Sequence, residues 1–280
     1  MPVRIIPRLD IKGPNLVKGI QLEGLRILGR PETFARHYYE QGADELLYMD
    51  IVASLYDRAS ILNIVERTSR ETHIPLTVGG GLRTVEDIRA VLGAGADKVA
   101  INTAALKRPA LIQEAVTRFG SSTIVISIEA KLRPDGTYEA YVESGRERTH
   151  LDACEWARRA VELGAGEIMV TSIDREGTGR GFDLGLLRTL ADELPVPVIA
   201  SGGAGGVDDV RRAIEDGHAD AVCVAGVLHY DLLTRLERES RVEAARGNPL
   251  GSKRPFQRLA PASMPEIKRH LLDHGGLCRV

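Results

Sequence analysis

Short apolar runs rich in Val and Ile recur along the chain and alternate with segments of helical periodicity. Such runs, when turn residues bound them, are typical of strands that are buried on both faces of a parallel sheet. They predict strands at residues 4–9, 45–50, 75–78, 98–102, 123–128, 167–171, 196–200 and 221–225. Eight strands alternating with helices in about 250 residues indicate an α/β fold of the (β/α)8 barrel type, and a doubly wound sheet is the alternative.

Helices are predicted between most of the strands. A Pro near the start and Gly42 at the end bound the first, and Thr84 stands three residues before Asp87 as in a capping box. The predicted ranges are residues 31–41, 84–92, 152–163, 183–193 and 207–216, with a final helix at residues 264–274.

The chain also repeats itself at a spacing of about 120 residues, and such repeats dictate architecture. Residues 7–12 correspond to residues 126–131, and residues 79–82 correspond to residues 201–204. Two half-barrels related by a pseudo-two-fold axis explain this pattern and favour the closed barrel. In that arrangement Asp10 and Glu129 face each other across the axis.

Two segments lie outside this rhythm, although the whole chain, residues 1–280, is predicted to form a single domain. Residues 133–149 follow strand five and predict a hairpin with residues 134–136 as its turn. An insertion at about residues 231–263 follows strand eight and is expected on the catalytic face. It is either a solvated surface excursion or a segment that covers the substrate or contacts a partner.

Composition narrows the class of protein. The chain is 43% hydrophobic, 27% charged and only 4% aromatic, with a formal net charge of -2, which gives no support for nucleic-acid or membrane binding. Its three cysteines, Cys154, Cys223 and Cys278, lack metal-ligand spacing, so no metal site is predicted and a reducing cytoplasm is expected. No signal-peptide pattern and no long apolar run occur.

Small residues mark the ends of four predicted strands. They are Gly80 and Gly81, Asn102 and Thr103, Gly202 and Gly203, and Ala225 and Gly226. Small residues let an anion approach backbone amides, and helix N-termini favour negative charge. A glycine-rich turn can equally be a packing feature, but its duplication here predicts a substrate with a phosphate at each end.

Asp10 and Glu129 are the candidate acid and base, because two carboxylates in one cavity can differ in protonation state. The alternative is that each forms an ion pair, Asp10 with Lys12 or Lys18 and Glu129 with Lys131. Asp50 and Asp174 are expected to bind hydroxyls or to orient neighbouring groups.

At the opposite ends of the strands lie Arg4, Glu45, Lys98 and Glu167. These four residues form either a salt-bridge plug at the barrel floor or a gated pore that leads into the barrel.

With these residues in place, the chain resembles the cyclase subunit of imidazole glycerol phosphate synthase, the HisF family. The matching motifs include residues 16–19, 42–45, 75–81, 95–99, 164–168, 174–178 and 200–205. The resemblance implies that ammonia from a HisH-like glutaminase subunit, paired one to one, enters past the floor ring, with Asp97 at the partner interface. It also implies that ammonia and a ribulosyl-formimino bis-phosphate give imidazole glycerol phosphate and aminoimidazole carboxamide ribotide without a cofactor. The expected substrate- and phosphate-binding residues are Lys18, Asp50, Gly80, Gly81, Asn102, Thr103, Thr171, Asp174, Gly177, Gly202, Gly203, Ala225 and Gly226.

The chain departs from the family at the catalytic face. Glu129 replaces an aspartate, and a shift of roughly 1 Å can cost about a hundredfold in rate. Arg8 replaces a small residue, and could pair with Glu129 or contact an anionic group of the acceptor. Glu176 also replaces an aspartate, and the insertion is not a family feature.

These departures keep a second hypothesis open, in which a HisF-like paralogue delivers ammonia to another acceptor, such as a nucleotide-linked sugar in surface polysaccharide amidation. A barrel that only activates its glutaminase and a phosphosugar isomerase are further alternatives. The isomerase would need neither the charged ring nor Asp97.

Overall fold

The computed structural model describes residues 2–20, 23–51, 58–244 and 258–279. Eight parallel strands form a closed barrel: β1 (Arg4–Lys12), β4 (Leu46–Asp50), β5 (Leu76–Gly79), β6 (Lys98–Ile101), β7 (Ile124–Leu132), β10 (Glu167–Ser172), β11 (Val198–Ser201) and β12 (Ala221–Val224). The strands pair in this order, and β7 pairs with β10 over six residue pairs to close the ring. The (β/α)8 prediction is therefore confirmed, and closure excludes the doubly wound sheet.

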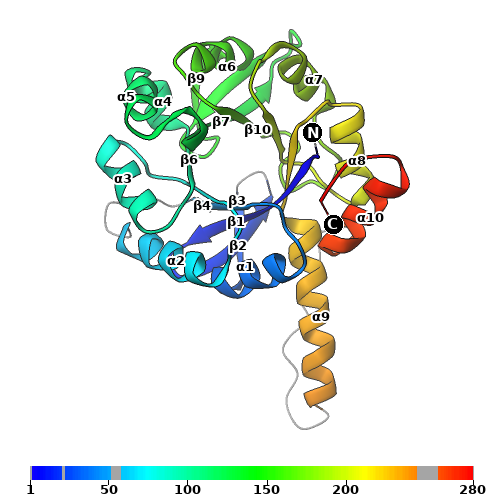
Figure 1. Cartoon of the computed structure of the whole chain (residues 1–280). Coiled ribbons are helices and arrows are strands. Elements are labelled where there is room, and N and C mark those ends of the chain that lie inside the picture. Colours follow the sequence, from blue (N-terminus) through cyan, green and yellow to red (C-terminus); the bar gives the residue numbers. More distant parts are fainter. Residues whose placement is uncertain (1, 21–22, 52–57, 245–257, 280) are drawn as a thin grey trace.

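Helices surround the strands (Figure 1). Their bounds are α1 (Pro31–Glu40), α2 (Arg58–Glu71), α3 (Val85–Gly93), α4 (Thr103–Lys107), α5 (Ala110–Phe119), α6 (Ala153–Glu162), α7 (Leu184–Glu193), α8 (Val207–Glu215), α9 (Gly226–Ala244) and α10 (Met264–Asp273). The six predicted helices are present within one or two residues of their expected ends. The Thr84 hydroxyl accepts a hydrogen bond from the Asp87 amide, so the predicted capping box is confirmed.

Alternation along the strands divides the core into two layers. Outward-facing residues such as Ile5, Leu9 and Val99 pack under the helices in one large cluster. Inward-facing residues form a smaller cluster on the barrel axis: Ile6, Leu47, Ala100, Val125, Met169, Ile199, Ala221 and Cys223. The barrel interior is thus a packed apolar layer with charged groups above and below it.

A hairpin that the sequence did not predict follows strand one. β2 (Asn15–Ile20) pairs antiparallel with β1 and with β3 (Glu23–Gly29). Because β2 returns beside the carboxyl end of β1, it places Lys18 at the mouth of the barrel.

The segment after strand five makes two reversals instead of the single predicted hairpin. Residues 134–136 do form a turn, which joins the extended β7 to β8 (Tyr138–Val142). A second turn leads into β9 (Glu147–Asp152) and contains Glu143, Ser144 and Gly145, all with positive φ. We call residues 143–146 the hairpin tip.

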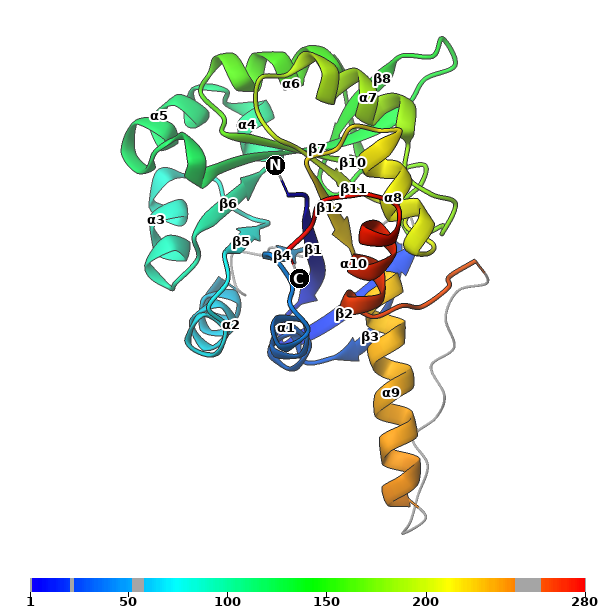
Figure 2. The same cartoon turned by 45° about the vertical axis from the view of Figure 1, so that its right-hand side comes forward.

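The chain after strand eight begins as a helix packed on the barrel. Leu232 and Leu233 are buried, so the first turns of α9 belong to the barrel itself. Farther on, α9 extends beyond the body on the side of β2 and β3 (Figure 2). Residues 245–257, the middle of the predicted insertion, lie outside the described residues.

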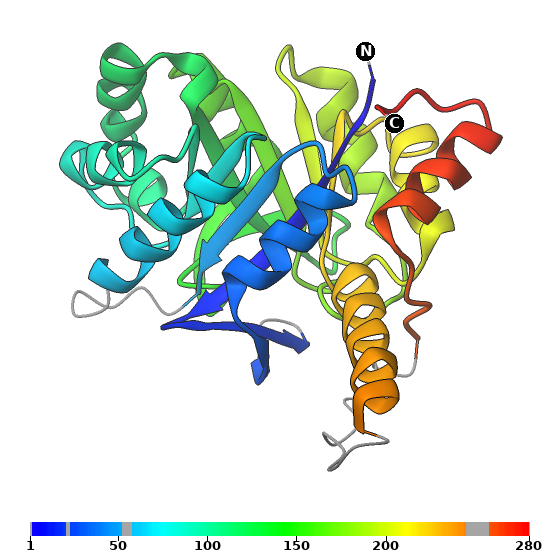
Figure 3. The ribbon, with the colours of Figure 1, turned by 60° about the horizontal axis from the view of Figure 1, so that its bottom comes forward.

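The two chain ends lie on the other side of the barrel (Figure 3), where Val3 bridges to Cys278. Within the described residues, no helix combines the length and the apolar character needed to cross a membrane.

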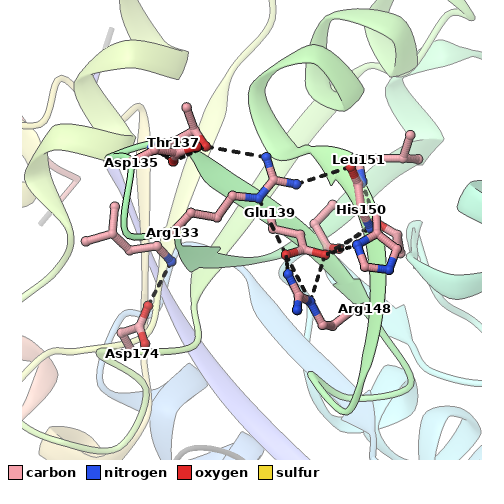
Figure 4. Close-up of polar contacts among 11 residues, drawn as sticks. Arg133, Asp135, Thr137, Glu139, Arg148, His150, Leu151 and Asp174 are labelled. Atoms are coloured by element: carbon pink, nitrogen blue, oxygen red, sulfur yellow. Dashed lines mark hydrogen bonds and ion pairs between the residues drawn. The ribbon is translucent and has the colours of Figure 1, made fainter.

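A buried carboxylate joins β8 to β9 (Figure 4). Glu139, 1% exposed, accepts hydrogen bonds from Arg148 Nη2 at 2.8 Å and from the His150 amide at 2.9 Å. Arg133 Nε lies 3.5 Å from the same carboxylate. Hydrogen bonding from Arg148 is the main reason why the pKa of Glu139 falls to about 2.

We expect Glu139→Gln to destabilise the protein by about 1 kcal/mol at neutral pH, a modest amount because Arg148 is solvent-exposed. Since the folded-state pKa lies below the ordinary value of 4.5, this contribution is present above pH 4.5 and disappears as the pH falls toward 2. Urea denaturation of both proteins at pH 7 and pH 3 measures it. Glu147→Gln, at an exposed carboxylate of the same hairpin, is the control. A pH-independent difference would contradict the prediction.

Candidate active site

The two candidate acids lie on opposite sides of the barrel mouth. Asp10 is near the carboxyl end of β1, and Glu129 is near that of β7, with three strands between them in either direction around the ring. The half-barrel repeat therefore places them as the sequence predicted.

Asp10 is buried, 3% exposed, in a group of four charged side chains. Arg8 Nε donates to Asp10 Oδ1 at 2.9 Å, and Lys18 Nζ lies 3.9 Å from Oδ2. Lys18 also forms an ion pair with Glu176. We call Arg8, Lys18, Asp10 and Glu176 the mouth cluster. Its two positive and two negative charges compensate one another, which buried charges require.

These contacts decide between the ion pairs that were expected for Arg8 and for Asp10. Arg8 pairs with Asp10 and not with Glu129. Of the two lysines considered for Asp10, the structure brings Lys18 to it.

Glu129 has a different environment. Asn102 Nδ2 and the Gly145 backbone amide both donate to its Oε2, at 3.0 and 2.8 Å. Its expected partner Lys131 lies instead over the ring of Tyr141. Burial without a directly paired cation raises the pKa of Glu129 to about 7, although its amide donors and Arg8 oppose the rise. A carboxyl group with this pKa can give and take a proton near neutral pH.

The predicted phosphate-binding residues of the second half lie together. Gly177, Gly202, Gly203, Ala225 and Gly226 line one pocket. Arg8, Lys18 and Glu176 of the mouth cluster and Leu259, from the last part of the predicted insertion, also line it. Here glycine is required: a Cβ at Gly203 would lie 2.3 Å from the Gly181 carbonyl oxygen.

The corresponding residues of the first half have different neighbours, and one of them, Thr103, contacts the hairpin tip. Gly80 lies so close to Asp50 that a Cβ would be 2.1 Å from the Asp50 carbonyl oxygen. Thr103 Oγ1 accepts a hydrogen bond from the Glu143 amide, while Asn102 holds Glu129. Asn102 is therefore a partner of the acid in this structure, in addition to its predicted place beside a phosphate.

Two equivalent carboxylates hold the turns that lead into α3 and α8. Asp87 Oδ2 accepts from the amides of Arg83 and Thr84, and Asp209 Oδ2 accepts from those of Gly205 and Gly206. These four amides precede the two helices, and their hydrogen bonds to the carboxylates make them unavailable to a phosphate.

The remaining residues that were predicted to bind the substrate have separate surroundings. Thr171 is buried and lies 3.3 Å from Arg8 Nη1. Asp174 accepts a hydrogen bond from the Leu132 amide at 3.0 Å, which stabilises the start of the hairpin region (Figure 4). Asp50 is the last residue of β4 and lies beside Gly80, and it is not without a partner.

Sequence reasoning missed several residues at the mouth. Ser201 accepts a hydrogen bond from Arg8 Nη1 at 2.9 Å, and Gly145 holds Glu129. Ser144 and Arg146 line a second pocket that Asp10 and Lys18 also line. The position of Ser201 directly before Gly202 could have identified it from the sequence as a residue of the mouth. The tip residues had no such signal, because only the fold brings them over the barrel.

The four charged residues at the floor form the predicted ring. Arg4 Nη1 lies 2.8 Å from Glu45 and 3.1 Å from Glu167, and Lys98 Nζ lies 3.0 Å from each of the same two carboxylates. Cations and anions alternate, so every charge has two opposite neighbours. Asp97, the predicted interface residue, is exposed next to this ring and accepts a hydrogen bond from the Leu76 amide.

The chain is similar to known proteins over most of its length. A family model described as "Histidine biosynthesis protein" matches residues 4–234. A protein of Legionella pneumophila named imidazole glycerol phosphate synthase subunit HisF is 55% identical over 207 residues, which cover 74% of this chain and 98% of that protein. A protein of the same name from Alkaliphilus metalliredigens is 48% identical over 228 residues, covering 81% of this chain and 90% of that protein.

Glu129→Gln is expected to stabilise the fold, because a neutral amide avoids the cost of a half-buried carboxylate that has no directly paired cation. Since the folded-state pKa of about 7 lies above the ordinary 4.5, the cost is absent below pH 4.5 and complete above pH 7. The gain should be on the order of 2 kcal/mol at pH 8 and much smaller at pH 5. Denaturation at both pH values measures it, with Glu147→Gln as control. Equal effects at both values would refute the prediction.

Proposed function

The chain belongs to the histidine biosynthesis family and, within it, to the HisF subunits of imidazole glycerol phosphate synthase, and we propose that the barrel mouth is its cyclase site. The observation that carries the proposal is the position of Asp10 and Glu129 opposite each other, with a strand-end glycine group in each half-barrel. A ribulosyl-formimino bis-phosphate, which has a phosphate at each end, matches that arrangement.

In the proposed reaction the two acids act on the part of the substrate that lies between its phosphates. Ammonia joins this part, the adduct is cleaved and cyclised, and the products are imidazole glycerol phosphate and aminoimidazole carboxamide ribotide. Glu129, with a pKa of about 7, serves as the group that gives and takes protons. Asp10 provides the second carboxylate and remains tied to the mouth cluster.

The two phosphates would bind mainly to backbone amides. In the second half these are the amides at Gly177, Gly202, Gly203, Ala225 and Gly226, and in the first half those at Gly80, Gly81 and Thr103. Lys18 and Thr171 are proposed to complete the substrate site, together with Asn102, Asp50 and Asp174. Small residues suit this role because they let the ligand approach the backbone closely.

As a HisF-type subunit, the chain works as part of a complex. We propose that its partner is a HisH-like glutaminase bound one to one at the barrel floor, with Asp97 in the interface. Ammonia would pass the ring of Arg4, Glu45, Lys98 and Glu167 and then the apolar axial layer. An apolar layer suits the neutral molecule better than the ammonium ion, because burying an unpaired charge is costly.

The alternative acceptor, a nucleotide-linked sugar, is not proposed, because the similar relatives carry the name of the imidazole glycerol phosphate synthase subunit. A cytoplasmic location stays a prediction from the sequence.

The purified protein, with excess ammonium at alkaline pH and no partner, should release the carboxamide ribotide from the ribulosyl-formimino bis-phosphate. Asp10→Asn should lower this turnover at least about a hundredfold, the usual range for positioned acid–base groups, in a sample that circular dichroism shows to be folded. Lack of turnover by the folded wild type, beside an active HisF control, would overturn the proposed function. Near-normal turnover of Asp10→Asn would remove Asp10 from the mechanism.

Lys98→Ala should disturb glutamine-driven turnover of the complex several-fold more than ammonium-driven turnover. The reason is that the ring would lose one of its two cations on the proposed ammonia path, while the mouth stays intact. The ratio of the two rates is the readout. Arg36→Ala removes an exposed ion pair on α1 and should leave the ratio unchanged. Equal effects of Lys98→Ala on both rates would make the ring purely structural.

A further inference from the structure

Arg8 is a buried cation on the inner face of the barrel. Side chains alternate along β1, so Ile6, Arg8 and Asp10 share the inward face, and Arg8 is only 5% exposed. Ile6 belongs to the axial apolar layer. The guanidinium therefore lies one step above this layer and one step below Asp10.

Three hydrogen bonds fix the guanidinium. Nε donates to Asp10 Oδ1 at 2.9 Å, and Nη1 donates to Ser201 Oγ at 2.9 Å and to Thr171 Oγ1 at 3.3 Å. Thr171 and Ser201 belong to β10 and β11, in the other half of the barrel from β1. Arg8 thus links the carboxylate of one half-barrel to the strands of the other.

We propose that Arg8 is a positioning residue, which holds Asp10 from inside the barrel and supplies the positive charge that acts on Glu129. The proposal deepens the cyclase function proposed above and rests on it. Arg8 works through the two acids, and its planar fork suits this task because its donors are fixed relative to one another.

The charges of Arg8 and Asp10 have opposite effects on the pKa of Glu129. Arg8 Nη1 donates to Thr171, which is the residue of β10 in register with Glu129 of β7. From this position the Arg8 guanidinium lowers the pKa of Glu129, whereas the Asp10 carboxylate raises it. Glu129 also accepts hydrogen bonds from the uncharged amides of Asn102 and Gly145. Lys131, two residues farther along β7, is exposed and lies over Tyr141. Arg8 and Asp10 therefore act on Glu129 with opposite signs, and single substitutions of the two must move its titration in opposite directions.

The test is the titration of the Glu129 carboxyl group by carbon-detected NMR in the full chain, which does not require turnover. Arg8→Gln should shift the Glu129 titration to higher pH, and Asp10→Asn should shift it to lower pH. In the double variant, which removes both charges, Glu129 should titrate near its wild-type pH. Because this variant leaves neither charge unpaired, it also serves as a control for misfolding caused by one unpaired charge. Arg8→Lys keeps the charge and should shift the titration less than Arg8→Gln.

The turnover rate with added ammonium separates the effect of the Arg8 charge from the effect of its fixed hydrogen-bond donors. Arg8→Lys should lower kcat at least about tenfold while changing KM less, because the fork that holds Asp10 is lost even though the charge remains. Arg188→Lys, at an arginine that donates to a backbone carbonyl on the surface, is the matched control.

The outcomes are distinguishable. If the Glu129 titration does not move in Arg8→Gln, or if Arg8→Lys turns over like the wild type, the positioning role is overturned. If the wild type itself lacks turnover, the proposed function fails, and the NMR titrations still decide whether Arg8 acts on Glu129.

Discussion

Charge compensation inside a closed barrel is the constraint on which the rest of this structure depends. A charge that is removed from water has to meet opposite charge or hydrogen-bond donors at close range. Here the interior charges form two separate groups, and each group balances two cations against two anions. The floor ring does so below the apolar axial layer, and the mouth cluster does so above it. The apolar layer between them can then pack without an unpaired charge.

Glu129 is the exception, and its position explains its proposed task. Two amide donors hold one of its oxygens, and no cation is directly paired with it among the described residues. Its protonated and ionised forms are consequently close in free energy near neutral pH. Asp10, in contrast, is bonded directly to the Arg8 guanidinium. The half-barrel repeat supplies two equivalent carboxylates, and their different surroundings give them different roles.

The two halves differ around the acids as well. In the second half, the glycines at the ends of β10, β11 and β12 line a pocket that Leu259 borders. In the first half, Thr103 is bonded to the hairpin tip, which comes from the second half and also bonds to Glu129. The ends of a bis-phosphate substrate are not chemically identical, so a site with a different wall at each end can distinguish its two orientations.

The sequence by itself determined the eight barrel strands, six of the helices and the opposition of Asp10 and Glu129. Apolar runs and the internal repeat are local or periodic signals, and barrel closure follows from them. It did not determine the β2–β3 hairpin, which has no strong alternation, or the partners of the buried charges. Arg8 meets Thr171 and Ser201 across sequence separations of 163 and 193 residues, and Gly145 reaches Glu129 only because the hairpin folds back over the mouth. Tertiary structure decided these pairings, because ion pairs and hydrogen bonds depend on distances of a few ångströms, and only the closed barrel sets those distances.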